Sequence, residues 1–177
     1  MEELNRITVE DFKTAEKTPL IVVLDNVRSQ NNIGSVFRTS DAFRVEEICL
    51  CGICSTPPHR DIHKTALGAE DSVEWKYYEE TTTCIHELKE KGYYVISVEQ
   101  VDESMKLDQE AVLNRMIEGK KIAIVFGNEV DGVDEKVIEL SDECLEIPQY
   151  GTKHSLNISI AAGIVIWEMW KILRIKN

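Results

Sequence analysis

Three short polar segments of the chain carry side chains that could bind a ligand or transfer a group. The first covers residues 26–38 and places Asn32, Gly34 and Arg38 at N-x-G-x-x-x-R spacing. Gly34 allows a backbone or a ligand to approach closely. Arg38 carries a rigid fork of N–H donors that suits a phosphate or a carboxylate. The alternative is an arginine on a solvated helix face, which is the usual place for this residue.

The second segment, residues 126–132, reads Phe-Gly-Asn-Glu-Val-Asp-Gly. It lacks the Gly-Lys-Ser/Thr ending of a phosphate-binding loop and the G-x-G-x-x-G of a dinucleotide fold. Its two acids, Glu129 and Asp131, suit a cationic or hydroxyl-rich ligand better than a triphosphate. A tight turn from strand to helix, built on its glycines, explains the pattern equally well.

The third segment leads into Ser155 and Asn157 at the start of an apolar helix expected over residues 156–173. A helix with so little polar surface must be covered on most sides. Polar groups at its buried end then need partners, because leaving them unpaired is costly. A helix cap accounts well for Ser155 but poorly for Asn157, since Asn is a weak helix former. We therefore interpret this segment as part of a site.

Strands and helices alternate along the chain, which predicts an α/β fold with a parallel sheet flanked by helices on both faces. Strands are expected at 20–24, 47–51, 73–77, 93–98, 121–126 and 144–147, and the main helices at 33–43, 81–91, 134–140 and 156–173. Each of the three polar segments follows the end of a strand. Ligands of such sheets bind beyond the carboxyl ends of the strands, so the three segments are expected to meet there.

The length of 177 residues suits a single domain, residues 1–177, with residues 1–19 as a short helical extension. No apolar run reaches a transmembrane length and no signal peptide is present, so we expect a cytoplasmic protein without membrane contact. The net charge of −12 argues against an indiscriminate nucleic-acid binder. Several basic residues in the first third still allow a local positive patch: Arg28, Arg38, Arg44, Arg60 and Lys64.

Cys51-x-x-Cys54, with His59 and His63 downstream, resembles a metal-binding pattern. No second cysteine pair follows at the spacing of a zinc site. Cys51 also ends an expected buried strand, where a free cysteine behaves as a small hydrophobic residue. We therefore expect reduced cysteines that pack in the core and no metal.

Taken together, the motifs resemble the SpoU-type (TrmH-like) branch of the SPOUT RNA methyltransferases over residues 20–173. Three ordered motifs carry the resemblance: Asn32-Ile-Gly-Ser-Val-Phe-Arg38-Thr-Ser-Asp-Ala-Phe, Ile124-Val-Phe-Gly-Asn-Glu129-Val-Asp-Gly132, and Ile147-Pro-x-x-Gly-x-x-x-Ser155-Leu-Asn157-Ile-Ser-Ile-Ala-Ala. Two features depart from the family pattern. Residues 149–154, including His154, match it poorly, and we expect no N-terminal RNA-binding domain of the kind that many relatives carry.

The resemblance implies a deep trefoil knot in the C-terminal part and a homodimer with active sites at the subunit interface. It implies transfer of a methyl group from S-adenosyl-L-methionine to a ribose 2′-hydroxyl of tRNA or rRNA. The cofactor contacts it implies are Gly127, Ile147 and Leu156. The catalytic constellation it implies is Asn32, Arg38, Glu129, Ser155 and Asn157.

A guanidinium is effectively never deprotonated in proteins. We therefore expect Arg38 to hold a neighbouring RNA phosphate and to stabilise the developing alkoxide, while Ser155 and Asn157 orient it and the substrate. Two alternatives remain open: a cofactor-binding module without catalysis, and a methyltransferase of a different small substrate, which the acidic net charge favours.

Overall fold

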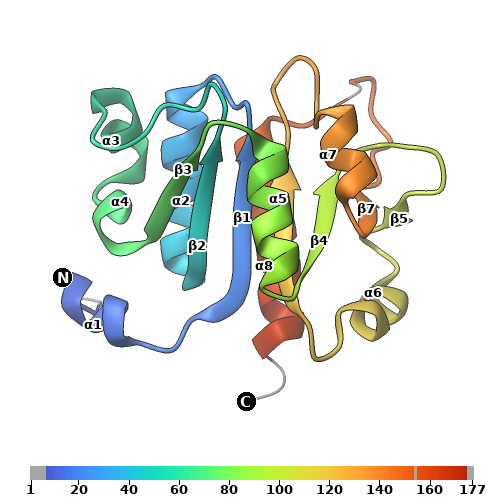
Figure 1. Ribbon diagram of the computed structural model, residues 1–177, viewed down its shortest axis with the longest axis horizontal. Helices are drawn as coiled ribbons and strands as arrows, with labels where there is room; N and C mark the ends of the chain where they lie inside the picture. Colours follow the sequence, from blue (N-terminus) through green and yellow to red (C-terminus); the bar gives the residue numbers. More distant parts are fainter. Residues whose placement is uncertain (1–6, 154, 175–177) are drawn as a thin grey trace.

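A sheet of seven parallel strands forms the middle layer of the protein (Figure 1). The computed structural model describes residues 7–153 and 155–174. The strand order across the sheet is β3-β2-β1-β6-β4-β7-β5, which makes β6 the central strand. The strands are β1 (Thr18–Asp25), β2 (Val45–Cys51), β3 (Glu74–Tyr78), β4 (Tyr93–Val98), β5 (Met105–Lys106), β6 (Lys121–Phe126) and β7 (Glu143–Glu146).

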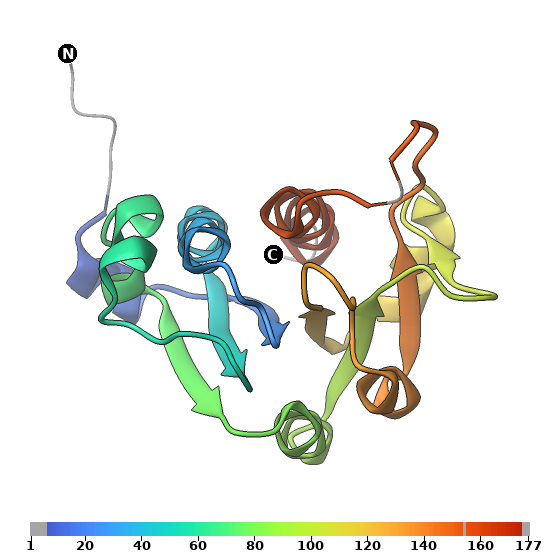
Figure 2. The same ribbon diagram turned by 90° about the horizontal axis from the view of Figure 1, so that it is seen from above.

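Helices cover both faces of this sheet (Figure 2). The helices are α1 (Val9–Thr14), α2 (Gln30–Ala42), α3 (Arg60–Ala66), α4 (Ala69–Ser72), α5 (Thr81–Glu90), α6 (Glu110–Ile117), α7 (Glu135–Leu140) and α8 (Ile158–Arg174). Helices α5 and α7 pack on one face. Helices α2 and α8 lie side by side on the other face, with α1, α3, α4 and α6 around them. The predicted α/β architecture is confirmed.

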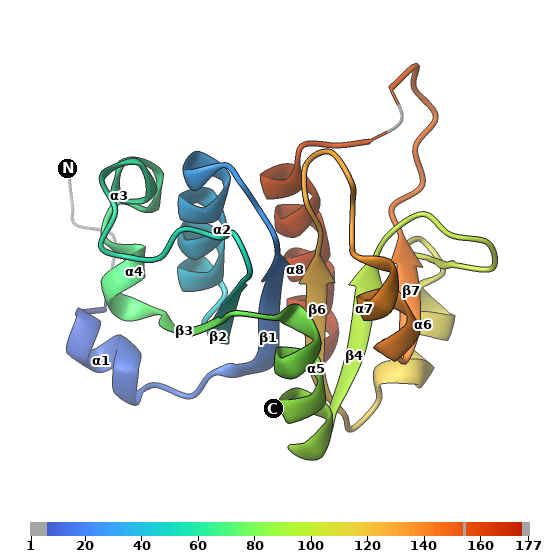
Figure 3. The ribbon, with the colours of Figure 1, turned by 45° about the horizontal axis from the view of Figure 1, so that its top comes forward.

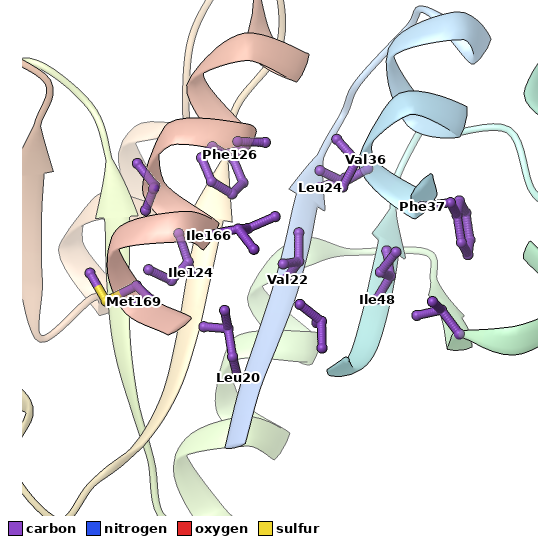
Figure 4. Close-up of a cluster of buried hydrophobic side chains, with 14 of the residues drawn as sticks. Leu20, Val22, Leu24, Val36, Phe37, Ile48, Ile124, Phe126, Ile166 and Met169 are labelled. Carbon is purple, nitrogen blue, oxygen red and sulfur yellow. The ribbon is translucent and has the colours of Figure 1, made fainter. Parts of the chain in front are cut away.

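Strand β1 forms the middle of the core because five of its eight residues are apolar and buried, and they lie on both faces of the sheet. Leu20, Val22 and Leu24 point toward α2 and α8 (Figure 4), and Ile21 and Val23 point toward α5. Each of the five is at most 3% exposed. Complete burial of such a side chain contributes about 1.5–3 kcal/mol. This run therefore fixes the strand that carries the first polar segment.

The order of the strands in the sheet reverses between β1 and β6. Strands β1, β2 and β3 extend one way, and the later strands lie on the other side of β1. Leu24 near the end of β1 pairs with Phe126 at the end of β6, so the loops that follow leave the sheet side by side (Figure 3). Such a point of reversal is where open parallel sheets bind ligands.

Three details differ from the sequence predictions. Strand β5 and helix α4 were missed, since two and four residues are too short to show a periodicity. Helix α8 begins at Ile158 rather than at residue 156. It is also not covered on most sides within one chain, because Ile160, Ile164 and Trp167 are 55%, 36% and 44% exposed.

The knot implied by the family resemblance stays a prediction. Among the helices of the described residues, none is long and apolar enough to cross a membrane.

Candidate active site

A cavity of about 510 Å³ opens at the carboxyl ends of β4, β6 and β7. This volume is in the range of small-molecule sites. The second and third polar segments form much of its wall, and it includes all three predicted cofactor contacts. The predicted site residues that line it are Gly127, Glu129, Ile147, Ser155, Leu156 and Asn157.

The loop after β6 is held in one shape by two of its own residues. Gly127 has no room for a side chain, since a Cβ there would lie 2.1 Å from the carbonyl carbon of Gly132. The side-chain oxygen of Asn128 accepts a hydrogen bond from the backbone N–H of Val130 at 2.8 Å, and its Nδ2 donates to the carbonyl of Asn26 at 2.7 Å. Asn128 was not among the site residues predicted from the sequence. Its signal was an Asn inside a glycine-bounded turn, where the side chain bonds backbone two residues on.

The carboxylate of Glu129 joins this loop to the start of α2. It accepts hydrogen bonds from the backbone N–H groups of Arg28 and Ser29 and from Nδ2 of Asn32, each at 3.0 Å. Burial is the largest single influence and raises the pKa of Glu129, but these hydrogen bonds together outweigh it and lower the pKa. A negative charge at a helix N-terminus is also favourable. Glu129 therefore stays ionised and acts as an anchor.

Asn157 connects the third segment to the same network. Its Nδ2 donates to Oδ1 of Asn32 at 3.3 Å, and its Oδ1 accepts from the backbone N–H of Ser159 at 2.9 Å. The second bond caps α8, so the helix cap that was the alternative interpretation of Ser155 lies at Asn157 instead. Asn157 lies before the helix, where its weak helix propensity costs nothing. Ser155 and Asn157 are exposed in the single chain, which corrects the expectation of a buried polar end.

A continuous chain of hydrogen bonds thus runs from Asn157 through Asn32 to Glu129. It brings together one residue from each of the three polar segments, and the two hydrogen-bonded pairs are 97 and 125 residues apart along the sequence. Ser155 lies on the wall of the same cavity.

Arg38 is not brought to this cavity within the single chain. It is exposed on α2 and lines a separate hollow of about 670 Å³, together with Thr8, Asp41, Arg44 and Leu67. Four of the five predicted catalytic residues therefore gather in one place, and the fifth points elsewhere.

Gly34 serves helix packing rather than ligand binding. A Cβ at this position would lie 2.2 Å from Oγ1 of Thr65 and 2.3 Å from the carbonyl oxygen of Ile62. Gly34 was expected to allow the close approach of a backbone or of a ligand. The structure shows the approach of a backbone, which belongs to helix α3.

Two carboxylates at strand ends hold the surrounding loops, and neither was among the site residues predicted from the sequence. Asp25, only 1% exposed, accepts from Oγ1 of Thr81 at 2.6 Å and from the backbone N–H of Asp134 at 2.8 Å. Glu99 accepts from the backbone N–H of Val133 at 3.0 Å. Their signal was an acid directly after a buried strand, since such a group needs partners in a dry environment.

The cysteines of the metal-like pattern pack in the core. Burial raises the pKa of the Cys54 thiol to about 12, and its Sγ donates to the carbonyl of Leu24 at 3.3 Å. Cys51 is fully buried in β2. His59 caps α3 through Nδ1, and His63 pairs with a carboxylate. Each of the four groups therefore has a structural environment of its own.

Comparison with known proteins identifies relatives along almost the whole chain. The 23S rRNA (guanosine-2'-O-)-methyltransferase RlmB of Neisseria meningitidis is 29% identical over 174 residues, which cover 98% of this chain and 67% of that protein. The protein of the same name from Vibrio parahaemolyticus is 30% identical, over 94% of this chain and 64% of that protein. The chain thus spans about two thirds of the length of these relatives.

Solved structures show the same fold. The A. aeolicus TrmH/SpoU tRNA modifying enzyme superposes with a TM-score of 0.80 at 26% identity, over 95% of this chain and 81% of that one. An AdoMet-bound rRNA methyltransferase from Sinorhizobium meliloti gives 0.79 at 24% identity, over 88% and 57%. The sequence profile of the SpoU rRNA methylase family matches residues 19–167. Since that match covers most of the chain, this protein belongs to the SpoU rRNA methylase family.

Proposed function

We propose that this protein transfers a methyl group from S-adenosyl-L-methionine to a ribose 2′-hydroxyl of tRNA or rRNA. The observation that carries the proposal is the hydrogen-bond chain from Asn157 through Asn32 to Glu129 at the wall of the cavity. Its three residues belong to the three motifs, in a chain of the SpoU family whose relatives include enzymes named 2'-O-methyltransferases.

The cavity fits the proposed cofactor in size and chemistry. Leu145, Ile147 and Leu156 give it an apolar wall, and the carboxylates of Glu99 and Glu146 suit a cationic ligand. When bound, S-adenosyl-L-methionine supplies a methyl group on a positively charged sulfur. Gly127, Ile147 and Leu156 would hold it.

The protein itself contributes mainly by positioning the attacking oxygen of the substrate. Methyl transfer requires the attacking oxygen to be in line with the bond that breaks, and correct placement alone lowers such barriers by several kcal/mol. The fixed amides of Asn32 and Asn157 and the hydroxyl of Ser155 offer hydrogen bonds to an incoming ribose. Arg38 holds the adjacent phosphate and stabilises charge that develops on the oxygen.

This division of labour requires a second copy of the chain, because Arg38 and Asn157 line different hollows in one copy. Helix α8 carries an exposed apolar stripe of Ile160, Ile164 and Trp167 that a two-fold partner could cover. A homodimer that places Arg38 of one subunit at the cavity of the other would complete the site.

Incubation with methyl-labelled S-adenosyl-L-methionine and unmodified total tRNA or rRNA tests the activity. Label in alkali-resistant dinucleotides supports 2′-O-methylation of ribose. Label in the bases contradicts the proposed chemistry. Cofactor binding without any transfer favours a binding module, and transfer to small nucleotides alone favours a different substrate.

A further inference from the structure

We infer that the hollow beside Arg38 is a subsite for one unpaired nucleotide of the RNA, next to the ribose that is methylated. The identity of the ligand as RNA rests on the proposed function. The hollow has a volume of about 670 Å³, enough for a nucleotide, and lies between α1, α2, α3 and α4, which Figure 3 shows grouped at one end of the molecule.

Unfavourable backbone conformations gather around this hollow. Four non-glycine residues of the described chain have positive φ, and two of them, Arg44 (φ 49°) and Leu67 (φ 55°), line it. A left-handed conformation is disfavoured for residues with a Cβ, and non-glycine residues in it cluster at ligand sites.

A leucine at position 67 is unfavourable for the stability of the fold in two respects. It follows α3 at the helix C-cap, where glycine is the ordinary choice, and the residue is 64% exposed. Neither backbone geometry nor core packing therefore explains a leucine at this position. Contact with a ligand that enters the hollow does explain it.

The walls of the hollow match the parts of a nucleotide. Leu67 and Val9, which are 64% and 39% exposed, supply apolar surface for a base. Arg38 and Arg44 supply cations for its phosphates, and neither is in an ion pair with another described residue. The carboxylate of Asp41 can accept hydrogen bonds from base amino groups, although Oγ of Ser72 already occupies one of its oxygens at 2.5 Å.

This hollow is also favourable for RNA by comparison with the rest of the molecule. Its lining carries two arginines and two aspartates, Asp41 and Asp71, in a chain whose net charge is −12. The two pairs of charges cancel, so the phosphates of an RNA strand anchored here would meet less repulsion than the net charge of the chain suggests. Unpaired bases, which can leave the stack and enter a pocket, are the usual targets of RNA recognition.

Leu67→Gly separates a binding role from a structural one. The substitution relieves the backbone strain, so the melting temperature is expected to stay equal or rise. The dissociation constant for a fluorescein-labelled single-stranded RNA decamer of mixed sequence, measured by anisotropy, is expected to rise by about fivefold or more, the scale of one lost contact to a base. The same decamer in duplex form is expected to bind more weakly and to respond less.

Glu103→Gly is the matched control, since Glu103 has a positive φ of 68° but does not line the hollow. It should also keep or raise the melting temperature, and it should leave RNA binding equal or slightly tighter because it removes an acid. Arg44→Gly should weaken binding and reduce the slope of log Kd against log salt by about 0.7.

Unchanged RNA binding in Leu67→Gly, or a wild-type protein that does not bind the decamer, would overturn the subsite. A loss of dimer affinity in sedimentation without a loss of RNA binding would also overturn it, since the hollow would then be a subunit contact. The outcome is separable from that of the methylation assay. Binding that depends on Leu67 supports the subsite even without transfer, and methylation indifferent to Leu67 contradicts the subsite alone.

Discussion

The carboxylate of Glu129 accepts three N–H bonds, and the amide of Asn32 links it to Asn157. With its acceptor oxygens already engaged, Glu129 is poorly placed to take a proton from a substrate. Its contribution is to hold Asn32 and the start of α2 in position relative to the loop that follows β6. Removing it is therefore expected to disturb the geometry of the site as well as the stability of the fold.

Glu129→Gln is expected to make the free energy of unfolding depend less on pH in the acidic range. Folding lowers the pKa of Glu129 below its ordinary value of 4.5. The stabilisation from its carboxylate is then fully present above the unfolded pKa and is lost as the pH falls through the folded one. The difference in unfolding free energy between wild type and variant should therefore shrink as the pH falls from about 7 to about 3. Urea denaturation at several pH values measures it, and a constant difference would contradict the anchor role.

Arg38→Lys tests the fork geometry that we assign to this side chain. Lysine keeps the charge but cannot make two parallel hydrogen bonds to a phosphate. Single-turnover methylation is expected to fall by about tenfold or more, with cofactor affinity unchanged. Arg115→Lys, on α6 and away from both hollows, is the control and should have no effect. Near-normal transfer by Arg38→Lys would argue against the assigned role.

At the level of whole elements, α2 and α3 cross at Gly34, and this crossing places the first motif beside the hollow at Arg38. The close approach depends on the missing side chain, since a Cβ would lie within 2.3 Å of both Thr65 and Ile62. A shift of α3 would move Leu67 at its end, so helix packing and the shape of the hollow are coupled.

Gly34→Ala is accordingly expected to destabilise the protein by about 1–3 kcal/mol, because the extra methyl group meets backbone atoms that cannot rotate away. Gly151→Ala is the matched control, as nothing lies within 4 Å of a Cβ there. The free energy of unfolding, measured with urea, should be lower for Gly34→Ala than for Gly151→Ala. Equal stabilities would show that α3 moves aside without cost.

The elements themselves were largely predictable from the sequence. Long apolar runs such as residues 20–24 and 121–126 determine buried strands regardless of context. The cap of α8 was not predictable, because Ser155 and Asn157 are both good capping residues and the bond from Asn157 to Asn32 joins residues that are distant in sequence. The hollow that Arg38 lines was also not predictable. The first motif places Arg38 on α2, but it does not show which hollow this side chain faces.

At the level of the whole molecule, the proposed dimer predicts complementation between inactive variants. Arg38→Ala and Asn157→Ala should each abolish most activity. Dimers mixed from the two contain one complete site, so random mixing should restore about a quarter of the wild-type activity. Co-expression or joint refolding followed by the methylation assay measures this.

The pair Asn32→Ala and Asn157→Ala provides the control for complementation. These two residues are hydrogen-bonded within one chain, so every site in their mixed dimers carries a defect and activity should stay low. Restored activity in this control would contradict a site shared between subunits. Absence of restored activity in the mixture of Arg38→Ala and Asn157→Ala would contradict it as well.

The pairing of β1 with β6 also has a consequence for how the chain is made. Leu20 pairs with Ile122, and Leu24 pairs with Phe126, so β1 lacks a central neighbour until some hundred later residues leave the ribosome. At about 5–20 residues per second this takes several seconds. Throughout that time a nascent unit of β1, β2 and β3 has an open edge of unpaired backbone. Folding of the complete sheet is therefore slow by topology, and the open edge of β1 needs protection from other chains while the protein is synthesised.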